Sequence, residues 1–379
     1  MKIKALNVYP IKALRPISLE SATLTPQGIL HDRTYMLFKV NPDSSLRKMQ
    51  LSTFPQCALF SQEIVSSASS SPSTSESSGD TIRVRYNPPD PPPPADTHPL
   101  QGKTLSVPLV PDTAALDPVS VDLHGSPAEA LRMGDPYDAF FSACFGFPVI
   151  LVHIGSGRRR VLGTLAPGSP SAASSTPEQQ KHQTRSLLSS IASYFPSFSS
   201  LATQGKQVGD DPAWLTFTDC APYLVTSASS LSHPSLEPFK DDSLIMPKFR
   251  PNIVVEDPEE APFAEDFWAE LALPASGPGP SGARLLLTAN CGRCSSLNVD
   301  YDRGRPAAGP EGKLLNALMR DRRVDPGHKY APVFGRYAFL AVDAAREDPL
   351  ASVIRVRVGD DVVVVRRNPE RTVFDWGLS

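Results

Sequence analysis

The chain has 379 residues, 40 of them proline, and a formal net charge of −3. This length allows two or three domains, and the charge provides no general attraction for nucleic acid or acidic membranes. No stretch approaches the roughly 18 apolar residues of a membrane span, and five cysteines without framework spacing argue against a disulfide-stapled secreted fold. Because the N-terminus shows no signal or transit pattern, we expect a cytoplasmic protein, with association with mitochondria left open.

The first 65 residues predict short strands. Apolar residues alternate from Ile3 to Val8, a second run spans 17–24, and residues 34–40 are rich in β-formers after a turn at 26–28. Two inserts, near 66–80 and 88–97, consist mostly of Ser, Thr, Pro and Gly, so we expect them to be disordered. A strand is expected between them at 81–86. We therefore interpret the inserts as enlarged hairpin loops of one β-domain.

The middle of the chain predicts one helix and one buried strand. Apolar residues at spacings of three and four indicate a helix over 134–146, with Cys144 in the core, and a buried strand follows at 148–154. Residues 155–211 are mostly of low complexity and read as a linker, with an amphipathic segment around 187–194. Within this linker the basic run 158–160 is expected to be a solvated loop.

The second half predicts further strands and one short helix, capped by Ser227 and running to Leu231. Strands dominate, helices are few, and no βαβ alternation is apparent. The prediction is a mostly β fold of the α+β class, barrel-like and with peripheral helices. The expected strands are 222–226, 253–255, 285–288, 338–342 and 362–365.

The only closely spaced cysteines are Cys291 and Cys294, on either side of Gly292 and Arg293. A structural zinc site would need a second ligand pair, and His328 is distant in sequence. A thioredoxin-type dithiol would open a helix, whereas residues 295–300 alternate like a strand. A pair of core thiols is also open, although the Gly and Asn neighbours favour a turn near solvent. The fourth interpretation is a single thiolate ligand for a soft metal or a thiophilic cofactor, with an arginine beside it.

Other polar residues have ordinary interpretations when taken one at a time. Arg250 and Asn252 precede a buried strand, and Lys12 follows one. The run 31–33 could be a local ion pair, and Asp219 an ordinary strand entry. Their order and combination carry more information than any one of them.

That combination resembles the MOSC domain superfamily, molybdenum-cofactor-binding proteins that include the mitochondrial amidoxime reducing component and its bacterial relatives. The resemblance implies a MOSC N-terminal β-barrel domain over 1–130, a helix–strand connection over 131–154, the linker over 155–211 and a MOSC domain over 212–368. The runs that carry it are 9–12, 17–19, 28–33, 249–254, 263–268, 291–294, 299–300, 334–337 and 358–360.

The resemblance also implies roles for individual residues. Cys294 would be the molybdenum ligand beside the pterin dithiolene and oxygen ligands, a donor set suited to a redox metal. Asp219 matches an acidic residue near the metal and is our candidate for proton delivery or for orienting a metal-bound oxygen. The residues matching positions that hold the anionic pterin and its phosphate are Lys12, Arg33, Arg250 and Asn252.

Some positions depart from the family pattern. Ala13 stands where the family often has serine, and Cys220 and Ala221 stand where it has hydroxyl residues. Cys220 is therefore a candidate neighbour of the cofactor, with core packing as its ordinary interpretation. Leu297 and Asn298 replace the usual pair of threonines, which leaves the substrate preference open.

The function implied is a molybdenum-cofactor-dependent oxidoreductase that reduces small N-hydroxylated compounds such as amidoximes and hydroxylamines. Electrons would come from an external donor, expected to be cytochrome b5 with its NADH-dependent reductase, because no Rossmann or flavin motif is visible. One alternative is a cofactor carrier or sulfur-transfer protein with a persulfide on Cys294. The family's sulfurases carry an additional pyridoxal-phosphate domain, however, and nothing here resembles one. The other alternative is a non-catalytic binding protein.

Overall fold

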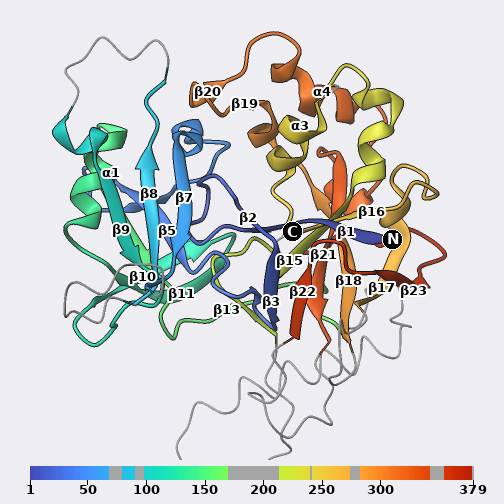
Figure 1. The fold of residues 1–379 in the computed structure, drawn as a ribbon, viewed down its shortest axis with the longest axis horizontal. Coiled ribbons are helices and arrows are strands. Elements are labelled where there is room, and N and C mark those ends of the chain that lie inside the picture. Colours follow the sequence, from blue (N-terminus) through green and yellow to red (C-terminus); the bar gives the residue numbers. More distant parts are fainter. Residues whose placement is uncertain are drawn as a thin grey trace, which may run out of the picture.

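The fold was obtained as a computed structural model (Figure 1). The structure describes residues 1–67, 79–89, 98–169, 213–239, 241–273, 282–341 and 354–377. The predicted amphipathic segment at 187–194 lies outside these residues. None of the helices in the described part of the chain has the length and apolar character that a membrane crossing needs.

The largest described sheet has eight strands, in the order β2-β1-β16-β15-β21-β18-β17-β23. In Figure 1 the dark blue β1 lies among the yellow, orange and red strands, so the first strands of the chain complete the sheet of its C-terminal half. The division into domains by sequence position stays a prediction. The strands of this sheet are β1 (Lys2–Val8), β2 (Ile17–Leu19), β15 (Tyr223–Ser227), β16 (Ile253–Glu256), β17 (Trp268–Leu273), β18 (Ala283–Gly292), β21 (Val333–Leu340) and β23 (Val363–Arg367).

The N-terminal half forms two further sheets, with orders β10-β11-β12-β5-β6 and β7-β8-β9. The strands that flank each Ser/Pro-rich insert pair antiparallel, β7 with β8 and β8 with β9, so both inserts connect hairpin strands as predicted. Their residues 68–78 and 90–97 lie outside the described residues. The strands are β5 (Tyr35–Val40), β6 (Leu46–Lys48), β7 (Phe60–Val65), β8 (Thr81–Tyr86), β9 (Thr104–Pro108), β10 (Asp117–Leu123), β11 (Ser126–Arg132) and β12 (Val149–His153).

Three small sheets complete the described β-structure. The second apolar run of the sequence, predicted as one strand, divides into β2 and β3, which belong to different sheets. The small sheets contain β3 (Ser21–Thr25) with β4 (Gly28–Ile29) and β22 (Ile354–Arg357), β13 (Arg159–Arg160) with β14 (Trp214–Leu215), and β19 (Val299–Asp300) with β20 (Arg305–Pro306).

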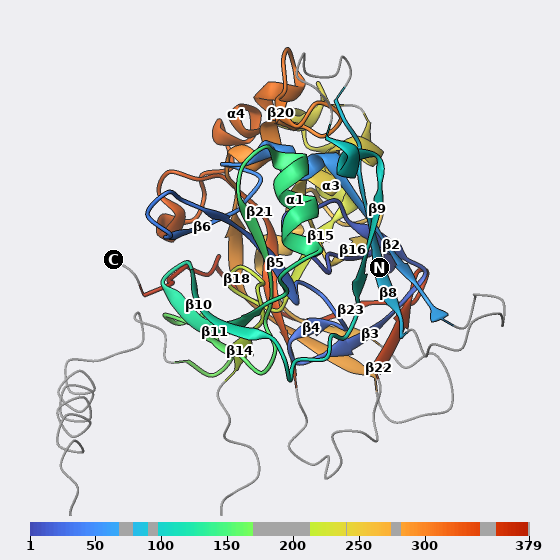
Figure 2. The ribbon, with the colours of Figure 1, turned by 90° about the vertical axis from the view of Figure 1, so that its left-hand side faces the viewer.

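The helices are short and peripheral, so the mostly β prediction is confirmed. The helix predicted over 134–146 is α1 (Tyr137–Phe145). It ends at Gly146, which has a left-handed conformation with φ 75°. Figure 2 shows α1 in green, and it packs on β12 with Cys144 buried, as expected. The other described α-helices are α3 (Asp242–Phe249) and α4 (Leu314–Met319).

Two local predictions differ from the structure. Ser227 does precede a helix, but this is the 3-10 helix η5 (Ala228–Ser232), and the Ser227 side chain makes no capping hydrogen bond. No βαβ alternation was expected, but one parallel crossover is present, because β15 and β16 are parallel neighbours joined through η5 and α3. Parallel neighbours need a long crossover connection. This connection contains short 3-10 helices, whose apolar residues do not show the spacing by which a helix is predicted.

A buried acidic pair lies in the 3-10 helix η7 (Ala264–Phe267), which directly precedes β17. The Glu265 and Asp266 side chains have no exposed surface, and Asp266 forms ion pairs with Arg322 and Arg371. Glu265 forms no ion pair with another described residue and accepts hydrogen bonds from the Ser230 hydroxyl. Burial accordingly raises the pKa of Glu265 to about 7, although the Ser230 contact opposes this shift.

We expect Glu265→Gln to flatten the pH dependence of stability. The folded-state pKa lies above the unfolded value, so the stabilisation is complete below about pH 4.5 and is lost as pH rises to about 7, by up to ~3 kcal/mol. Glutamine imitates the protonated acid. Thermal unfolding between pH 5 and 8 checks this, with the exposed Glu259→Gln as control. A variant that is less stable than the native protein at pH 8 would contradict the assignment.

Candidate functional site

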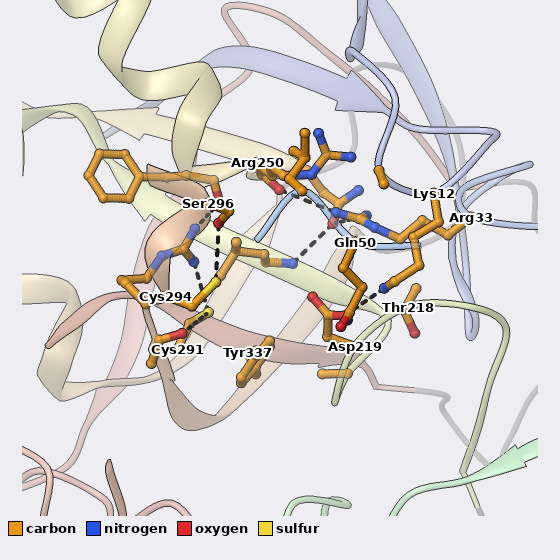
Figure 3. A pocket seen from close by; sticks show the side chains of 18 of the residues that line it. Lys12, Arg33, Gln50, Thr218, Asp219, Arg250, Cys291, Cys294, Ser296 and Tyr337 are labelled. Carbon is orange, nitrogen blue, oxygen red and sulfur yellow. Dashed lines mark hydrogen bonds and ion pairs between the residues drawn. The ribbon is translucent and has the colours of Figure 1, made fainter. Parts of the chain in front are cut away.

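A cleft lies where the strand ends of the large sheet meet the N-terminal half (Figure 3). Because β1 is antiparallel and β15 parallel to β16, the end of β1 and the starts of β15 and β16 lie at one edge of the sheet. The sheet thereby brings together residues that are far apart in the chain, such as Lys12 and Cys294, which are 282 positions apart. Among the residues lining the cleft are Lys12, Arg33, Asp219, Arg250, Asn252 and Cys294, which is every predicted site residue except Cys220.

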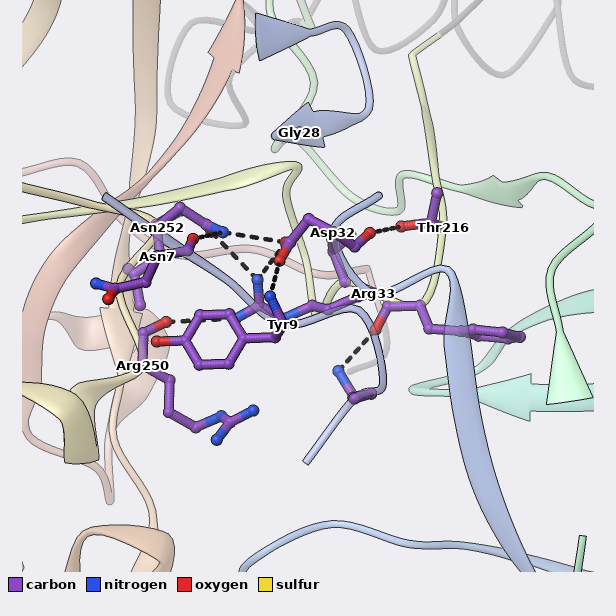
Figure 4. Close-up of polar contacts among 12 residues, drawn as sticks. Asn7, Tyr9, Gly28, Asp32, Arg33, Thr216, Arg250 and Asn252 are labelled. Carbon is purple, nitrogen blue, oxygen red and sulfur yellow. Dashed lines mark hydrogen bonds and ion pairs between the residues drawn. The ribbon is translucent and has the colours of Figure 1, made fainter. Parts of the chain in front are cut away.

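The base of the cleft is a buried polar network centred on Asp32 and Asn252 (Figure 4). The Asp32 carboxylate accepts hydrogen bonds from the Tyr9 amide at 2.8 Å and from Asn252 Nδ2 at 3.0 Å, and it pairs with the Arg33 guanidinium. Asn252 Oδ1 accepts from Arg33 Nη1 at 3.2 Å and from the Leu224 amide at 3.1 Å. Its amide is therefore occupied by the protein itself. Asn252 positions the arginine rather than offering a free donor to a ligand.

Tyr9 separates two cations. The guanidinium carbons of Arg33 and Arg250 each lie 4.4 Å from the centre of its ring, and its hydroxyl donates to the Pro251 carbonyl. Stacking on an aromatic face holds a guanidinium in place without neutralising it. Arg250 donates from Nη1 to the Leu14 carbonyl, while its buried Nη2 has no partner among the described residues.

Lys12 and Asp219 line the cleft and form a chain of ionisable groups with His124, which lies outside it. Lys12 Nζ lies 2.6 Å and His124 Nε2 3.2 Å from the same oxygen, Asp219 Oδ1. Burial lowers the pKa of Lys12 to about 8, against the attraction of Asp219. Burial alone would raise the pKa of Asp219, but Lys12 and His124 together hold it well below its ordinary value.

The two cysteines have different environments. Cys294 is exposed, just beyond the end of β18, with its Sγ 3.2 Å from Ser296 Oγ. Cys291 is buried within β18, and burial raises the pKa of its thiol. Arg293 donates from Nη1 to Cys291 Sγ at 2.9 Å and not to Cys294. The expected turn near solvent was therefore wrong for Asn290 and Cys291, which lie in a buried strand.

The expectation that residues 295–300 form a strand was also wrong. They form the 3-10 helix η8 (Ser295–Asn298) followed by β19, and the Leu297 amide donates to the Cys294 carbonyl at 3.2 Å. Alternating apolar residues over so short a run do not separate these two structures. The dithiol interpretation still lacks its βαβ unit, because β18 pairs antiparallel with both neighbours.

His328, distant in sequence, lies directly beside the cysteine run. The Gly292 amide donates to His328 Nε2 at 3.1 Å, and a Cβ at Gly292 would lie 2.5 Å from the His328 ring. The ring stacks on Phe374, and burial lowers its pKa. No three Cys, His, Asp or Glu side chains in the described ranges are arranged to hold a metal ion, so a zinc cluster receives no support there.

The interpretation of the basic run 158–160 as a solvated loop was wrong for Arg159. Its side chain is fully buried and donates to the carbonyls of Leu123, Ser126, Thr216 and Thr218. The backbone supplies these four acceptors, so no charged partner in the sequence signals the burial. Cys220 is buried in an apolar cluster with Tyr337 and Trp376 and does not line the cleft.

The residues present fit an anionic ligand that carries a phosphate and a soft donor. Three buried polar atoms of cleft residues have no partner among the described residues, namely Arg250 Nη2, Arg293 Nε and Thr218 Oγ1. Unpaired buried donors cost free energy unless a ligand accepts from them. The exposed Cys294 thiol also lines the cleft. The cleft therefore offers hydrogen-bond donors for a phosphate and a thiol for a soft metal.

Sequence reasoning missed several residues of this site. Tyr9 and Tyr337 belong to runs that carry the resemblance but were given no role of their own, and Gln50 and His124 were not considered. Of these, only His124 had a local signal, because His124-Gly125 forms a two-residue turn between alternating apolar runs.

Comparison with known proteins finds two domain matches in this chain. Residues 1–148 match the MOSC N-terminal beta barrel domain, and residues 212–363 match the MOSC domain. A stretch of 88 residues is 33% identical to a molybdenum cofactor sulfurase of Emericella nidulans. The likeness covers 22% of this chain and 10% of that relative, so the chain spans about a tenth of the relative's length. On the strength of the two matched domains, the chain belongs to the MOSC superfamily.

Proposed function

We propose that this protein is a molybdenum-cofactor-dependent oxidoreductase that reduces small N-hydroxylated compounds such as amidoximes and hydroxylamines. The observation that carries the proposal is an exposed cysteine, Cys294, in the lining of a cleft where Arg250 and Arg293 each have a buried donor atom with no partner among the described residues. A thiolate suits a soft redox metal, and fixed guanidinium groups suit a phosphate.

The chain's own residues would bind and orient the cofactor. Arg250 Nη2 and the Thr218 hydroxyl would donate hydrogen bonds to its phosphate or pterin. Arg33, which is held in place by Asn252, would add a positive charge. Cys294 would ligate the metal. When bound, the cofactor would supply two-electron redox chemistry at the metal. Electrons would come from a separate protein, for which cytochrome b5 and its NADH-dependent reductase are our candidates.

We expect anion binding to weaken above about pH 8. The protonated Lys12 attracts a phosphate, and its pKa is about 8 in the free cleft, so affinity is full below this pH and falls above it by up to about tenfold per unit. Isothermal titration of the metal-free protein with inorganic phosphate measures this. Lys12→Arg should remove the decline, because arginine stays charged. A decline that persists in Lys12→Arg would contradict the assignment to Lys12.

A sulfur-transfer function is the second candidate, favoured by the likeness to a molybdenum cofactor sulfurase over 88 residues. In that case Cys294 would carry a persulfide. The test is conversion of benzamidoxime to benzamidine by the metal-loaded protein with reduced methyl viologen as electron donor. Metal-loaded protein that leaves benzamidoxime unchanged, while metal-free protein accepts sulfane sulfur at Cys294, would favour sulfur transfer and overturn the reductase proposal.

A further inference from the structure

The turn that joins β10 to β11 is unusual in its sequence. It has two residues, His124 and Gly125, with φ of 59° and 73°. Turns with two positive φ values normally take Asn-Gly or Asp-Gly. A histidine tolerates this conformation but is not favoured in it. Its presence here points to a role for the side chain.

The backbone of this turn is held by side chains from elsewhere in the fold. Arg159 donates to the Leu123 carbonyl at 2.6 Å and to the Ser126 carbonyl at 3.1 Å, and Trp376 donates to the His124 carbonyl at 2.7 Å. The same Arg159 guanidinium donates to the Thr218 carbonyl at 2.6 Å. One buried cation thus fixes the turn and the segment leading to Asp219 relative to each other.

The result is a defined contact between His124 and Asp219. The Nε2–Oδ1 distance is 3.2 Å, and Asp219 Oδ2 has no hydrogen-bond partner among the described residues. Asp219 lines the cleft and its side chain is 46% exposed there, whereas His124 does not line the cleft and is 31% exposed. A ligand that fills the cleft would therefore cover Asp219 and leave His124 as its contact with solvent.

We propose that His124 is a proton-relay residue that passes protons from solvent to the Asp219 carboxylate at the cleft, with Arg159 positioning the pair. This inference rests on the proposed reductase function. Because Lys12 and His124 lower the pKa of Asp219, that carboxylate holds no proton of its own at neutral pH. It can orient a donor and transfer a proton, but the proton must arrive from a neighbour.

The reaction needs such a supply. An N-hydroxylated compound R–NH–OH takes two electrons, delivered singly by the external haem or flavin donor, and two protons. The N–O bond breaks, one N–H and one O–H bond form, and the products are R–NH₂ and water. For each proton, the imidazolium of His124 gives its Nε2 proton to Asp219 Oδ1, and the neutral imidazole is reprotonated by a hydronium ion or buffer acid of the solvent. The Asp219 carboxyl group then passes its proton to the substrate nitrogen or oxygen in the cleft and returns to the carboxylate.

Several charged groups lie around His124. Asp219 and Lys12 lie on the cleft side, Arg159 lies beneath the turn, and Asp122 of β10 accepts from the Gly125 amide at 3.1 Å. Gln50 Nε2 lies 3.4 Å from His124 Nε2. Substitutions at His124 should therefore be tested in a protein that keeps Asp219 and Lys12.

A first test uses ¹⁵N NMR of the metal-free protein and needs no activity. Because His124 Nε2 faces a carboxylate, neutral His124 should carry its proton on Nε2. In Asp219→Ala, which removes the acceptor, the ¹⁵N and ¹H shifts of this Nε2–H group should change, while His31 should keep its native spectrum. Shifts that are the same in Asp219→Ala as in the native protein would overturn the proposed contact.

The second test compares His124→Asn with His31→Asn in the metal-loaded protein. Both histidines have positive φ (59° and 68°), a conformation that asparagine accepts, so both variants should fold. We expect His124→Asn to lower kcat for benzamidoxime by about 10²-fold with little change in KM, to alter the kcat–pH profile, and to be partly rescued by added imidazole. His31→Asn should behave like the native protein. His124→Gln, which keeps an amide donor, serves as a second variant if His124→Asn unfolds.

The outcomes separate the two proposals. Native metal-loaded protein that does not reduce benzamidoxime contradicts the proposed function and the relay with it. Native protein that is active, together with His124 variants that keep full kcat and an unchanged pH profile, overturns the relay alone.

Discussion

Asp32→Asn should destabilise the protein more than any other single change in the cleft, by about 3–5 kcal/mol. Asp32 is buried and joins the Tyr9 amide, Asn252 and Arg33. Asparagine has nearly the same shape but no charge, so the buried Arg33 cation would lose its partner. The midpoint of urea unfolding of the metal-free protein measures the loss.

The control for this prediction is Asp302→Asn. Asp302 also pairs with an arginine, Arg15, but its side chain is 89% exposed, and exposed pairs contribute at most about 1 kcal/mol. Equal shifts of the unfolding midpoint in the two variants would contradict the view that the Asp32 network holds the cleft together.

Cys294→Ser should reduce turnover of benzamidoxime by at least about 10³-fold. Serine keeps the size of the side chain, but its hydroxyl is a hard donor and a poor ligand for a soft metal. The 3-10 helix that follows Cys294 is held by backbone contacts, so the fold should be unaffected. Turnover with reduced methyl viologen, measured beside thermal stability, separates lost chemistry from lost structure.

Cys291→Ser is the matched control at the other end of the same run. Cys291 is buried against Arg293 and its thiol stays protonated, so it is not expected to ligate the metal. Its replacement should lower stability modestly and retain most of the turnover. The opposite order of effects would assign the ligand to Cys291 and contradict the proposed role of Cys294.

Some of the strands and the longest described helix could be predicted because their signals are local. Alternating apolar residues marked β1, a run of β-forming residues marked β5, and spacings of three and four marked α1. The hairpin of β10 and β11 was not predicted. The parallel pairing of β15 with β16 could not be predicted in this way. Its crossover consists of 3-10 helices and the eight-residue α3. These segments are too short for the spacing of their apolar residues to identify them as helices.

The site was predicted through the order of its motifs rather than through geometry. Nothing local links Asp32 to Asn252, which are 220 positions apart and meet only because β1 pairs with β16. Arg159 was misjudged for a related reason, since its acceptors are backbone carbonyls that any sequence would supply. The asymmetry between Cys291 and Cys294 likewise depends on where β18 ends.

The most direct test of the account is the molybdenum content of the purified protein, produced in a host that makes the cofactor. Inductively coupled plasma mass spectrometry should find about one molybdenum per chain in the native protein and in Cys291→Ser, and little or none in Cys294→Ser. Native protein without molybdenum, or Cys294→Ser with as much as the native protein, would contradict the claim that this cleft binds the metal through Cys294.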